Sequence, residues 1–258
     1  MKILSRLIAL LLLPLSPCQI SADDTPRDKT VVLFAASSTM EAIETIKIAY
    51  ERQHPSVKIR VSYGASALLA RQISMGAPAD LFLSANINWI NWLEKNKTSM
   101  SAPIVIAGNG LTLISPKNSK LASCPHTVED FNALVGDKRF VIADPNVSPL
   151  GQYTKETLLL MGVWENIEPR LVIAGNANLV VKMIERGAAP YGFAYASSAT
   201  NNDAIKVLCP LTSEGINPIK YYLVKTHASQ DVESFANFLL YDGGEYFKKA
   251  GFSAYAPK

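Results

Sequence analysis

Short apolar runs alternate along the chain with longer segments in which apolar residues recur every three or four positions. The runs at 30–36, 57–63 and 79–83 are rich in β-branched and aromatic residues, which is typical of buried strands. The segments at 40–54 and 66–76 have the spacing of amphipathic helices. Strands that alternate with helices predict an α/β fold, in which a largely parallel sheet is covered on both faces.

The same alternation continues through the rest of the chain. Further strands are predicted at 103–107, 111–115, 139–143, 170–173, 191–195, 204–208 and 219–224. Further helices are predicted at 87–94, 128–134, 152–160, 179–186 and 232–250. The similar units in the two halves of the chain favour two α/β lobes rather than one large domain.

Two glycines, Gly108 and Gly110, lie between consecutive strand-like runs and permit a bend there. We place the first crossover between the lobes at this point. Lobe 1 is then formed by residues 30–107 plus 208–258, and lobe 2 by residues 108–207. We expect a mixed sheet flanked by helices in each lobe, with two crossover strands joining the lobes.

The N-terminal segment 1–22 has the pattern of an export signal. Lys2 and Arg6 precede the apolar run 7–15, and small residues end the segment near Ala22. The apolar run is too short for a membrane-spanning helix, which needs about 20 residues. We therefore expect an exported, periplasmic protein that is cleaved near Ala22, with an uncleaved anchor or a lipoprotein processed at Cys18 as the alternatives.

Composition narrows the class of protein. A content of 48% hydrophobic and 18% charged residues is that of an ordinary globular chain. Removing residues 1–22 would take away two basic residues and no acidic one, which lowers the net charge from +3 to +1. A nearly neutral chain without basic runs does not suit nucleic-acid binding, so we expect no nucleic-acid partner.

Cysteine and histidine patterns give no sign of a metal centre. The three histidines are isolated, and no CxxC or HExxH motif occurs. If Cys18 is removed with the signal, Cys124 and Cys209 remain as an even pair in an oxidising compartment. The sequence leaves open whether they form a disulfide or two separate buried thiols.

The candidate chemistry lies where predicted strands turn into helices. Helix N-termini present free backbone N–H groups and the positive end of the helix dipole, which suits an anion. Such turns gather at the carboxyl ends of the strands, where open α/β sheets bind ligands. Five turns carry small, polar or apolar residues and no Lys or Arg: Ser38, Ser66, Ala85, Leu150 and Ala177. Uncharged donors of this kind fit an oxyanion, although Ser38 and Ser66 could instead only cap their own helices.

Four segments resemble the substrate-binding proteins of molybdate ABC transporters, which are type II periplasmic binding proteins. These segments are FAASSTMEAI, GASALLARQISMGAPADLFLSA, ADPNVSPLGQY and ERGAAPYGFAYASSA. The resemblance extends from about residue 31 to residue 252. It implies a two-lobed protein that binds molybdate, and also tungstate, and delivers the anion to a membrane permease with an ATPase subunit. It further implies a monomer without cofactor or catalytic residues.

The resemblance also implies which groups hold the anion. These are the hydroxyls of Ser38 and Ser66 from lobe 1, and from lobe 2 the amides of Leu150 and Ala177 and the phenol of Tyr195, with the amide of Ala85 as a further donor. No separate metal site is expected, since the same residues would surround the metal of the oxyanion. The alternative for Tyr195 is a purely structural role, as a tyrosine of the core that contacts no ligand.

A site made only of donors has consequences for selectivity. Hydrogen phosphate carries an O–H that would find no acceptor, whereas sulfate matches molybdate in charge and shape and differs in size. A binding protein for another oxyanion such as sulfate is therefore the main alternative. A hydrolase is less favoured, because the chain has no GxSxG motif and no histidine in the five turns.

Overall fold

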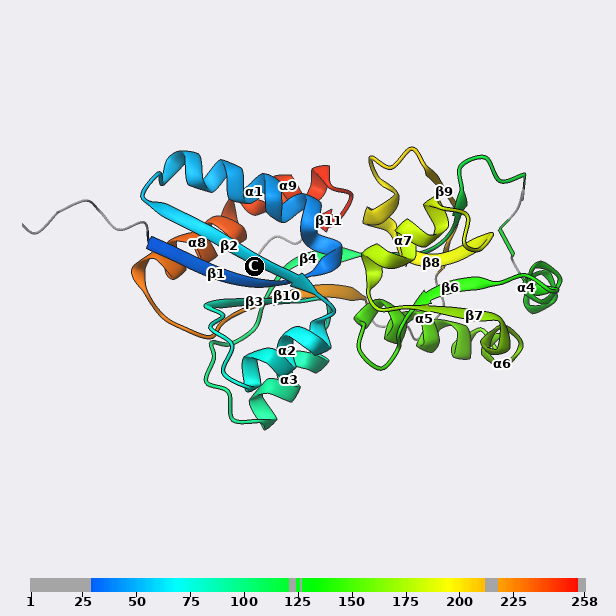
Figure 1. The fold of residues 1–258 in the computed structure, drawn as a ribbon, viewed down its shortest axis with the longest axis horizontal. Coiled ribbons are helices and arrows are strands. Elements are labelled where there is room, and N and C mark those ends of the chain that lie inside the picture. The colour runs from blue at the N-terminus through cyan, green and yellow to red at the C-terminus, as the bar shows by residue number, and fades with distance from the viewer. Residues whose placement is uncertain (1–28, 121–123, 126, 212–217, 255–258) are drawn as a thin grey trace, which may run out of the picture.

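Two lobes, each built around its own β-sheet, lie end to end in the computed structural model (Figure 1). The structure describes residues 29–120, 124–125, 127–211 and 218–254. The expected signal segment, its cleavage near Ala22 and Cys18 lie outside these residues. None of the helices in the described part of the chain is long and apolar enough to span a bilayer. The α/β fold with two mixed sheets predicted from the sequence is confirmed.

The first sheet has six strands in the order β11-β4-β10-β3-β1-β2. Its strands are β1 (Lys29–Ala36), β2 (Val57–Gly64), β3 (Leu81–Ser84), β4 (Ile104–Asn109), β10 (Ile219–Lys225) and β11 (Ser253–Ala254). The helices of this lobe are α1 (Met40–Gln53), α2 (Ser66–Ser74), α3 (Asn88–Lys95), α8 (Gln230–Tyr241) and α9 (Gly243–Lys249). β1 is parallel to β2 and β3, whereas β10 is antiparallel to β3 and β4.

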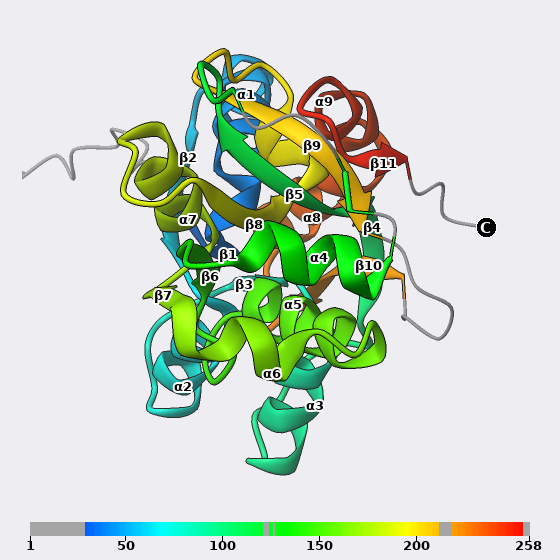
Figure 2. The same cartoon turned by 90° about the vertical axis from the view of Figure 1, so that its right-hand side faces the viewer.

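The second sheet has five strands in the order β7-β6-β8-β5-β9. Its strands are β5 (Leu111–Pro116), β6 (Phe140–Ala143), β7 (Leu171–Ala174), β8 (Tyr191–Tyr195) and β9 (Ile205–Leu211). Its helices are α4 (Val128–Val135), α5 (Pro149–Leu160), α6 (Trp164–Ile167) and α7 (Ala177–Glu185). In Figures 1 and 2, α7 lies on one side of this sheet and α5 and α6 lie on the other.

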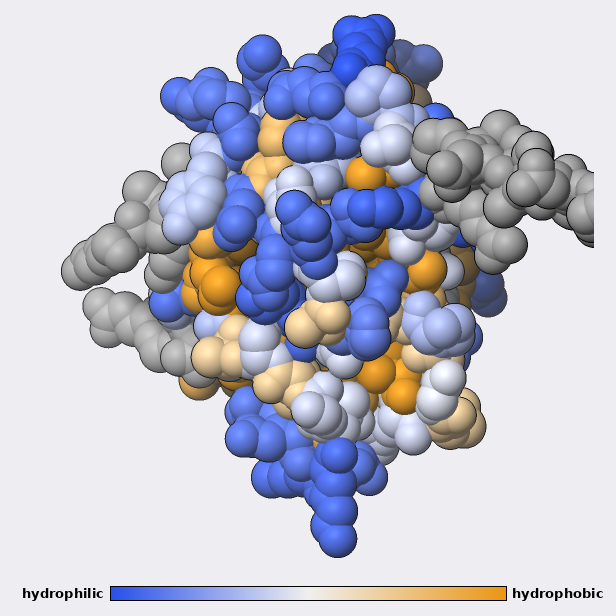
Figure 3. Space-filling model, turned by 90° about the vertical axis from the view of Figure 1, so that its left-hand side faces the viewer, coloured by the Kyte–Doolittle hydropathy of each residue, from blue (hydrophilic) through white to orange (hydrophobic). Residues whose placement is uncertain are grey.

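Burial on both faces explains why the central strands have continuous apolar sequences. On β3, Leu81 and Leu83 belong to the core cluster that also contains residues of α1 and α8. Phe82, which points to the opposite face, packs in the cluster that contains Leu69 of α2 and Trp89 of α3. Because these two clusters lie on opposite faces of β3, helices cover both faces of the sheet, as parallel strands require. The outer end of lobe 1 is mainly hydrophilic, with hydrophobic residues in small separate groups (Figure 3).

The C-terminal helix and two short elements differ from the sequence-based expectation. The C-terminal helix predicted at 232–250 is divided into α8 and α9, which meet at Asp242. Gly243 and Gly244 open the second helix, and glycine disfavours the helix interior. The four-residue helix α6 and the two-residue strand β11 were not predicted, because elements this short show no measurable period.

The order of the strands in the two sheets bears on where the chain crosses between the lobes. β4 of the first sheet ends at Asn109 and β5 of the second begins at Leu111, so Gly110 separates the lobes. β9 pairs with β5 over its whole length, and the expected boundary at residue 208 would divide this strand. We therefore propose that lobe 2 continues to Leu211 and that the chain returns to lobe 1 before Ile219.

Cys124 and Cys209 form a disulfide. It joins the segment before α4 to β9, so both partners belong to the second lobe. Of the two possibilities left open by the sequence, the structure has the cross-linked one.

Candidate functional site

Ser66 does not act as the cap that its position suggests. It is the first residue of α2, after the N-cap residue Ala65, and its side chain makes no capping bond. The side chain is fully buried, and its Oγ accepts a hydrogen bond from the Ala85 amide at 3.2 Å. Within the described residues the hydroxyl proton of Ser66 has no acceptor, so it is available to a ligand.

Ser38 is not a cap either. It is the middle residue of a 3-10 turn, Ser37–Thr39, and the N-cap of α1 is Thr39. The Ser38 hydroxyl is half-buried and forms a hydrogen bond with the hydroxyl of Tyr221, at 2.9 Å. Both capping interpretations are therefore wrong, and both hydroxyls are oriented by groups on other strands or turns.

The second lobe contributes two helix N-termini. Leu150 is the second residue of α5, and its side chain is fully buried in the lobe core. Ala177 is the first residue of α7, which is capped by the side chain of Asn176. Amides in the first turn of a helix have no carbonyl partner inside it, and these two donate to no other described backbone group. Each can offer an N–H but no charge.

Tyr195 ends β8 and is almost completely buried. Its hydroxyl meets full hydrogen-bond geometry with none of the described residues, although the Tyr221 hydroxyl lies close enough to interact with it. Burial raises the pKa of this phenol well above its ordinary value, and the neighbouring phenols of Tyr221 and Tyr153 raise it further. The group therefore stays protonated at neutral pH, as a hydrogen-bond donor must.

Contacts between the lobes bring these turns to one seam. The Tyr153 hydroxyl, on α5, donates to the Ala85 carbonyl at 3.4 Å, and the Ala67 amide donates to the Val147 carbonyl at 3.3 Å. The ring of Tyr195 lies 6.0 Å from that of Tyr221, which holds Ser38. α7, which begins at Ala177, packs against the turn that contains Ser38. All six sequence-predicted residues thus lie on elements that meet at this seam.

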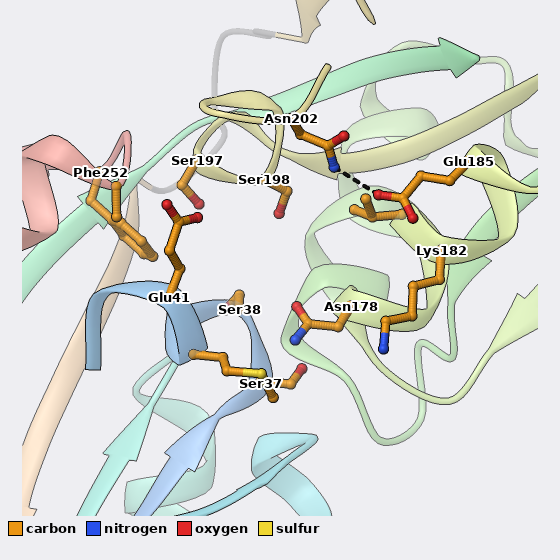
Figure 4. Close-up of a pocket in the computed structure, with 13 residues that line it drawn as sticks. Ser37, Ser38, Glu41, Asn178, Lys182, Glu185, Ser197, Ser198, Asn202 and Phe252 are labelled. Carbon is orange, nitrogen blue, oxygen red and sulfur yellow. Dashed lines mark hydrogen bonds between the residues drawn. The ribbon is translucent and has the colours of Figure 1, made fainter. Parts of the chain in front are cut away.

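A cavity of about 260 Å³ opens beside the seam (Figure 4). Lobe 1 lines it with residues that include Ser37, Ser38 and Glu41, and lobe 2 with residues that include Asn178 and Lys182. Of the six predicted residues only Ser38 lines it; the other five lie outside its wall. Ser38 therefore shares this cavity with charged side chains of both lobes, among them Glu41 and Lys182, and can be reached from it.

Sequence reasoning missed Asn109 and Tyr221. Asn109 lies between two glycines and was interpreted only as part of a bend, while Tyr221 lies in a strand whose pattern indicates burial alone. In the structure Tyr221 is fully buried, and its hydroxyl contacts both Ser38 and Asn109. Only tertiary contacts reveal this role, so no local signal could have found it.

The arrangement suits a small anion better than a cation. Hydroxyls and helix N-termini of both lobes lie on elements that meet at the seam, and no group of acidic, histidine or cysteine residues in the described chain could hold a metal ion. A buried anion needs hydrogen-bond donors in place of its hydration shell. The seam supplies such donors from both lobes.

Comparisons with known proteins agree with this geometry. The sequence profile of a family described as bacterial extracellular solute-binding protein matches residues 31–253. Molybdate-binding protein ModA of Haemophilus influenzae is 31% identical over 218 residues, which cover 83% of this chain and 86% of the relative. Molybdate-binding protein ModA of Escherichia coli is 30% identical over 230 residues, with coverages of 86% and 88%. The solved periplasmic molybdate-binding protein of Azotobacter vinelandii shares the fold, with a TM-score of 0.75, 18% identity and coverages of 88% and 100%.

Proposed function

The chain belongs to the family of bacterial extracellular solute-binding proteins, and on this premise we propose that it captures molybdate between its two lobes. We further propose that it binds tungstate, acts in the periplasm after export and passes the anion to a membrane permease driven by an ATPase. In this role it has no catalytic residue and no cofactor. The relatives named as molybdate-binding proteins support this choice of ligand.

The observation that supports the proposal is that elements carrying uncharged donors meet at the seam from both lobes. The donors are the hydroxyls of Ser38, Ser66 and Tyr195 and the amides of Leu150 and Ala177; the Ala85 amide donates to Ser66 Oγ and would have to release that bond to join them. Hydrogen bonds to a charged acceptor contribute roughly 1.5–3 kcal/mol each, so five or six supply on the order of 10 kcal/mol. Desolvation and ordering reduce this sum, and micromolar binding needs about −8 kcal/mol.

The two lobes have different tasks in this proposal. Lobe 1 receives the anion on Ser38 and Ser66, of which Ser38 is reached from the cavity between the lobes. Closure about the crossover strands then brings the amides of Leu150 and Ala177 and the phenol of Tyr195 onto it. The closed shape, which exists only with both lobes engaged, is what the permease would recognise.

Calorimetric titration of the mature protein with four anions tests the proposal. We expect micromolar or tighter binding of molybdate and tungstate, weaker binding of the smaller sulfate, and at least 100-fold weaker binding of phosphate, whose O–H finds no acceptor. Tight binding of sulfate without binding of molybdate would contradict the proposal, and so would turnover of an ester substrate.

Replacing Tyr195 by phenylalanine tests the contribution of lobe 2. The change removes one donor to a charged acceptor, so we expect about tenfold weaker molybdate binding, which is less than the loss caused by removing both serines. The matched control is Tyr63→Phe, because the Tyr63 hydroxyl donates to Glu44, a residue of its own lobe outside the proposed site, at 3.0 Å. Equal affinity in wild type and Tyr195→Phe would remove Tyr195 from the site.

A further inference from the structure

Asn109 connects the two lobes through its side-chain amide. Its Nδ2 donates to the Ser197 hydroxyl of lobe 2 at 2.8 Å and to the Tyr221 hydroxyl of lobe 1 at 3.3 Å. Its Oδ1 accepts from the backbone amides of Gly110 at 3.0 Å and Ser197 at 3.2 Å. All four contacts lie at the first crossover, beside the turn that carries Ser38.

These contacts determine which way round the Asn109 amide lies. A backbone N–H can only donate, so the atom that faces Gly110 and Ser197 must be the oxygen. The nitrogen, which can only donate, then faces Tyr221. The opposite orientation would set the amide nitrogen against two backbone N–H groups.

The orientation of Asn109 in turn determines the direction of the next hydrogen bond. The Tyr221 oxygen accepts a hydrogen bond from Asn109 Nδ2, and the phenol keeps its own proton because burial raises its pKa. The phenol has two neighbouring hydroxyls, Ser38 and Tyr195, and of these Ser38 Oγ, at 2.9 Å, meets hydrogen-bond geometry, whereas the Tyr195 hydroxyl does not. Tyr221 therefore donates to Ser38, which is left with a free proton.

We propose that Asn109 and Tyr221 are positioning residues that fix the Ser38 hydroxyl as a donor, and that they thereby favour unprotonated oxyanions over hydrogen phosphate. This inference rests on the proposed function, because it concerns the same site. The hydrogen-bond chain Asn109–Tyr221–Ser38 runs in one direction, from the amide to the ligand. Tyr221 accepts a hydrogen bond from Asn109 and donates one to Ser38, and Ser38 in turn donates to the ligand.

The one-way chain explains how a serine can take part in selectivity. A free hydroxyl rotates and can accept a hydrogen bond as readily as donate one. Ser38 could then accept the O–H of hydrogen phosphate. When its oxygen already accepts from Tyr221, accepting from a ligand leaves its own proton without a partner, which is unfavourable at a site with little water.

Replacing Tyr221 by phenylalanine tests the hydrogen-bond chain, because the change removes the hydroxyl that donates a hydrogen bond to Ser38. At about pH 8 phosphate is mostly hydrogen phosphate, whereas molybdate and sulfate carry no proton. We expect molybdate and sulfate to bind three- to tenfold more weakly and phosphate to bind equally or more tightly, so that the molybdate-to-phosphate affinity ratio falls at least threefold. Competition calorimetry measures this ratio, and Tyr222→Phe on the same strand is the matched control, expected to leave it unchanged.

Asn109→Asp provides a second, stronger test. A carboxylate still accepts from the two backbone amides, but its other oxygen accepts from Tyr221 and turns the phenol proton away from Ser38. We expect the affinity for molybdate to fall further than in Tyr221→Phe, and the molybdate-to-phosphate affinity ratio to fall as well. Thermal unfolding of both variants checks that they are folded.

The outcomes separate the two proposals. A parallel loss for molybdate, sulfate and phosphate in Tyr221→Phe, beside normal binding by the wild type, would show a merely structural tyrosine and overturn the hydrogen-bond chain. An unchanged ratio in both variants would overturn it as well. Absence of molybdate binding by the wild-type protein would instead overturn the proposed function, and the chain with it.

Discussion

Molybdate binding is expected to weaken at least 100-fold when Ser38 and Ser66 are both replaced by alanine. Each substitution removes one hydroxyl donor to a doubly charged anion, and one such bond contributes about 1.5–3 kcal/mol, which corresponds to a tenfold or greater change in affinity. Alanine fills the space of serine closely, so little repacking is expected around the buried Ser66. Calorimetry of the double variant and of the two single variants measures the effect.

Ser74, which lies on α2 together with Ser66, provides the control. Ser74 ends α2, is exposed, and donates to the Arg71 carbonyl at 2.9 Å, so Ser74→Ala should bind molybdate like the wild type. The two site serines lie on separate turns, and their effects should multiply to a first approximation. Wild-type affinity in both single variants would exclude these hydroxyls from the site.

The fold was predictable where buried strands and amphipathic helices leave a strong period in the sequence. β3 illustrates this, because Leu81, Phe82 and Leu83 are apolar in succession only since both faces of the strand are covered. α1 and α2 likewise begin after β1 and β2 near the predicted places. Local pattern suffices for such elements, since each residue's burial follows from its own position in the period.

Elements that depend on distant partners were predicted less well. β9 was expected to leave the second lobe at residue 208, but its pairing with β5, a strand far away in the sequence, keeps it there to Leu211. The helix predicted at 232–250 kept its apolar period across Gly243, so the interruption was not evident. Strand pairing and the placement of a helix end are set by tertiary contacts, which the period does not contain.

The candidate site shows the same division. The turns themselves were predictable, since each follows a strand and opens a helix or helical turn. The partners of their side chains were not, because Ser38 is oriented by Tyr221, which is 183 residues away in the chain. The capping interpretation of Ser38 and Ser66 was wrong for this reason, and Asn109 was missed for the same one. Whether the six residues bind the anion stays a prediction.

The second large effect is expected from Gly151→Ala, which we predict to destabilise lobe 2 and to abolish tight molybdate binding. Gly151 is buried in the first turn of α5, directly after Leu150. A Cβ atom there would overlap the Ala143 carbonyl oxygen at the end of β6 and would lie 2.6 Å from the carbonyl carbon of Asp144. Both obstacles are backbone atoms, which cannot rotate away as a side chain can. α5 must therefore move off the end of the sheet.

This movement links stability to binding, because α5 carries the Leu150 amide and also Tyr153, which contacts the Ala85 turn across the seam. Overpacking of this kind costs about 1–3 kcal/mol or more in the free energy of unfolding, which urea unfolding measures, while calorimetry measures the loss of affinity. Gly244→Ala is the matched control. That glycine also lies in the first turn of a helix, α9, but an added Cβ would meet nothing within 4 Å, so we expect unchanged or slightly raised stability and normal binding. If Gly151→Ala kept wild-type stability and affinity, close contact between α5 and β6 could not be what positions the Leu150 amide.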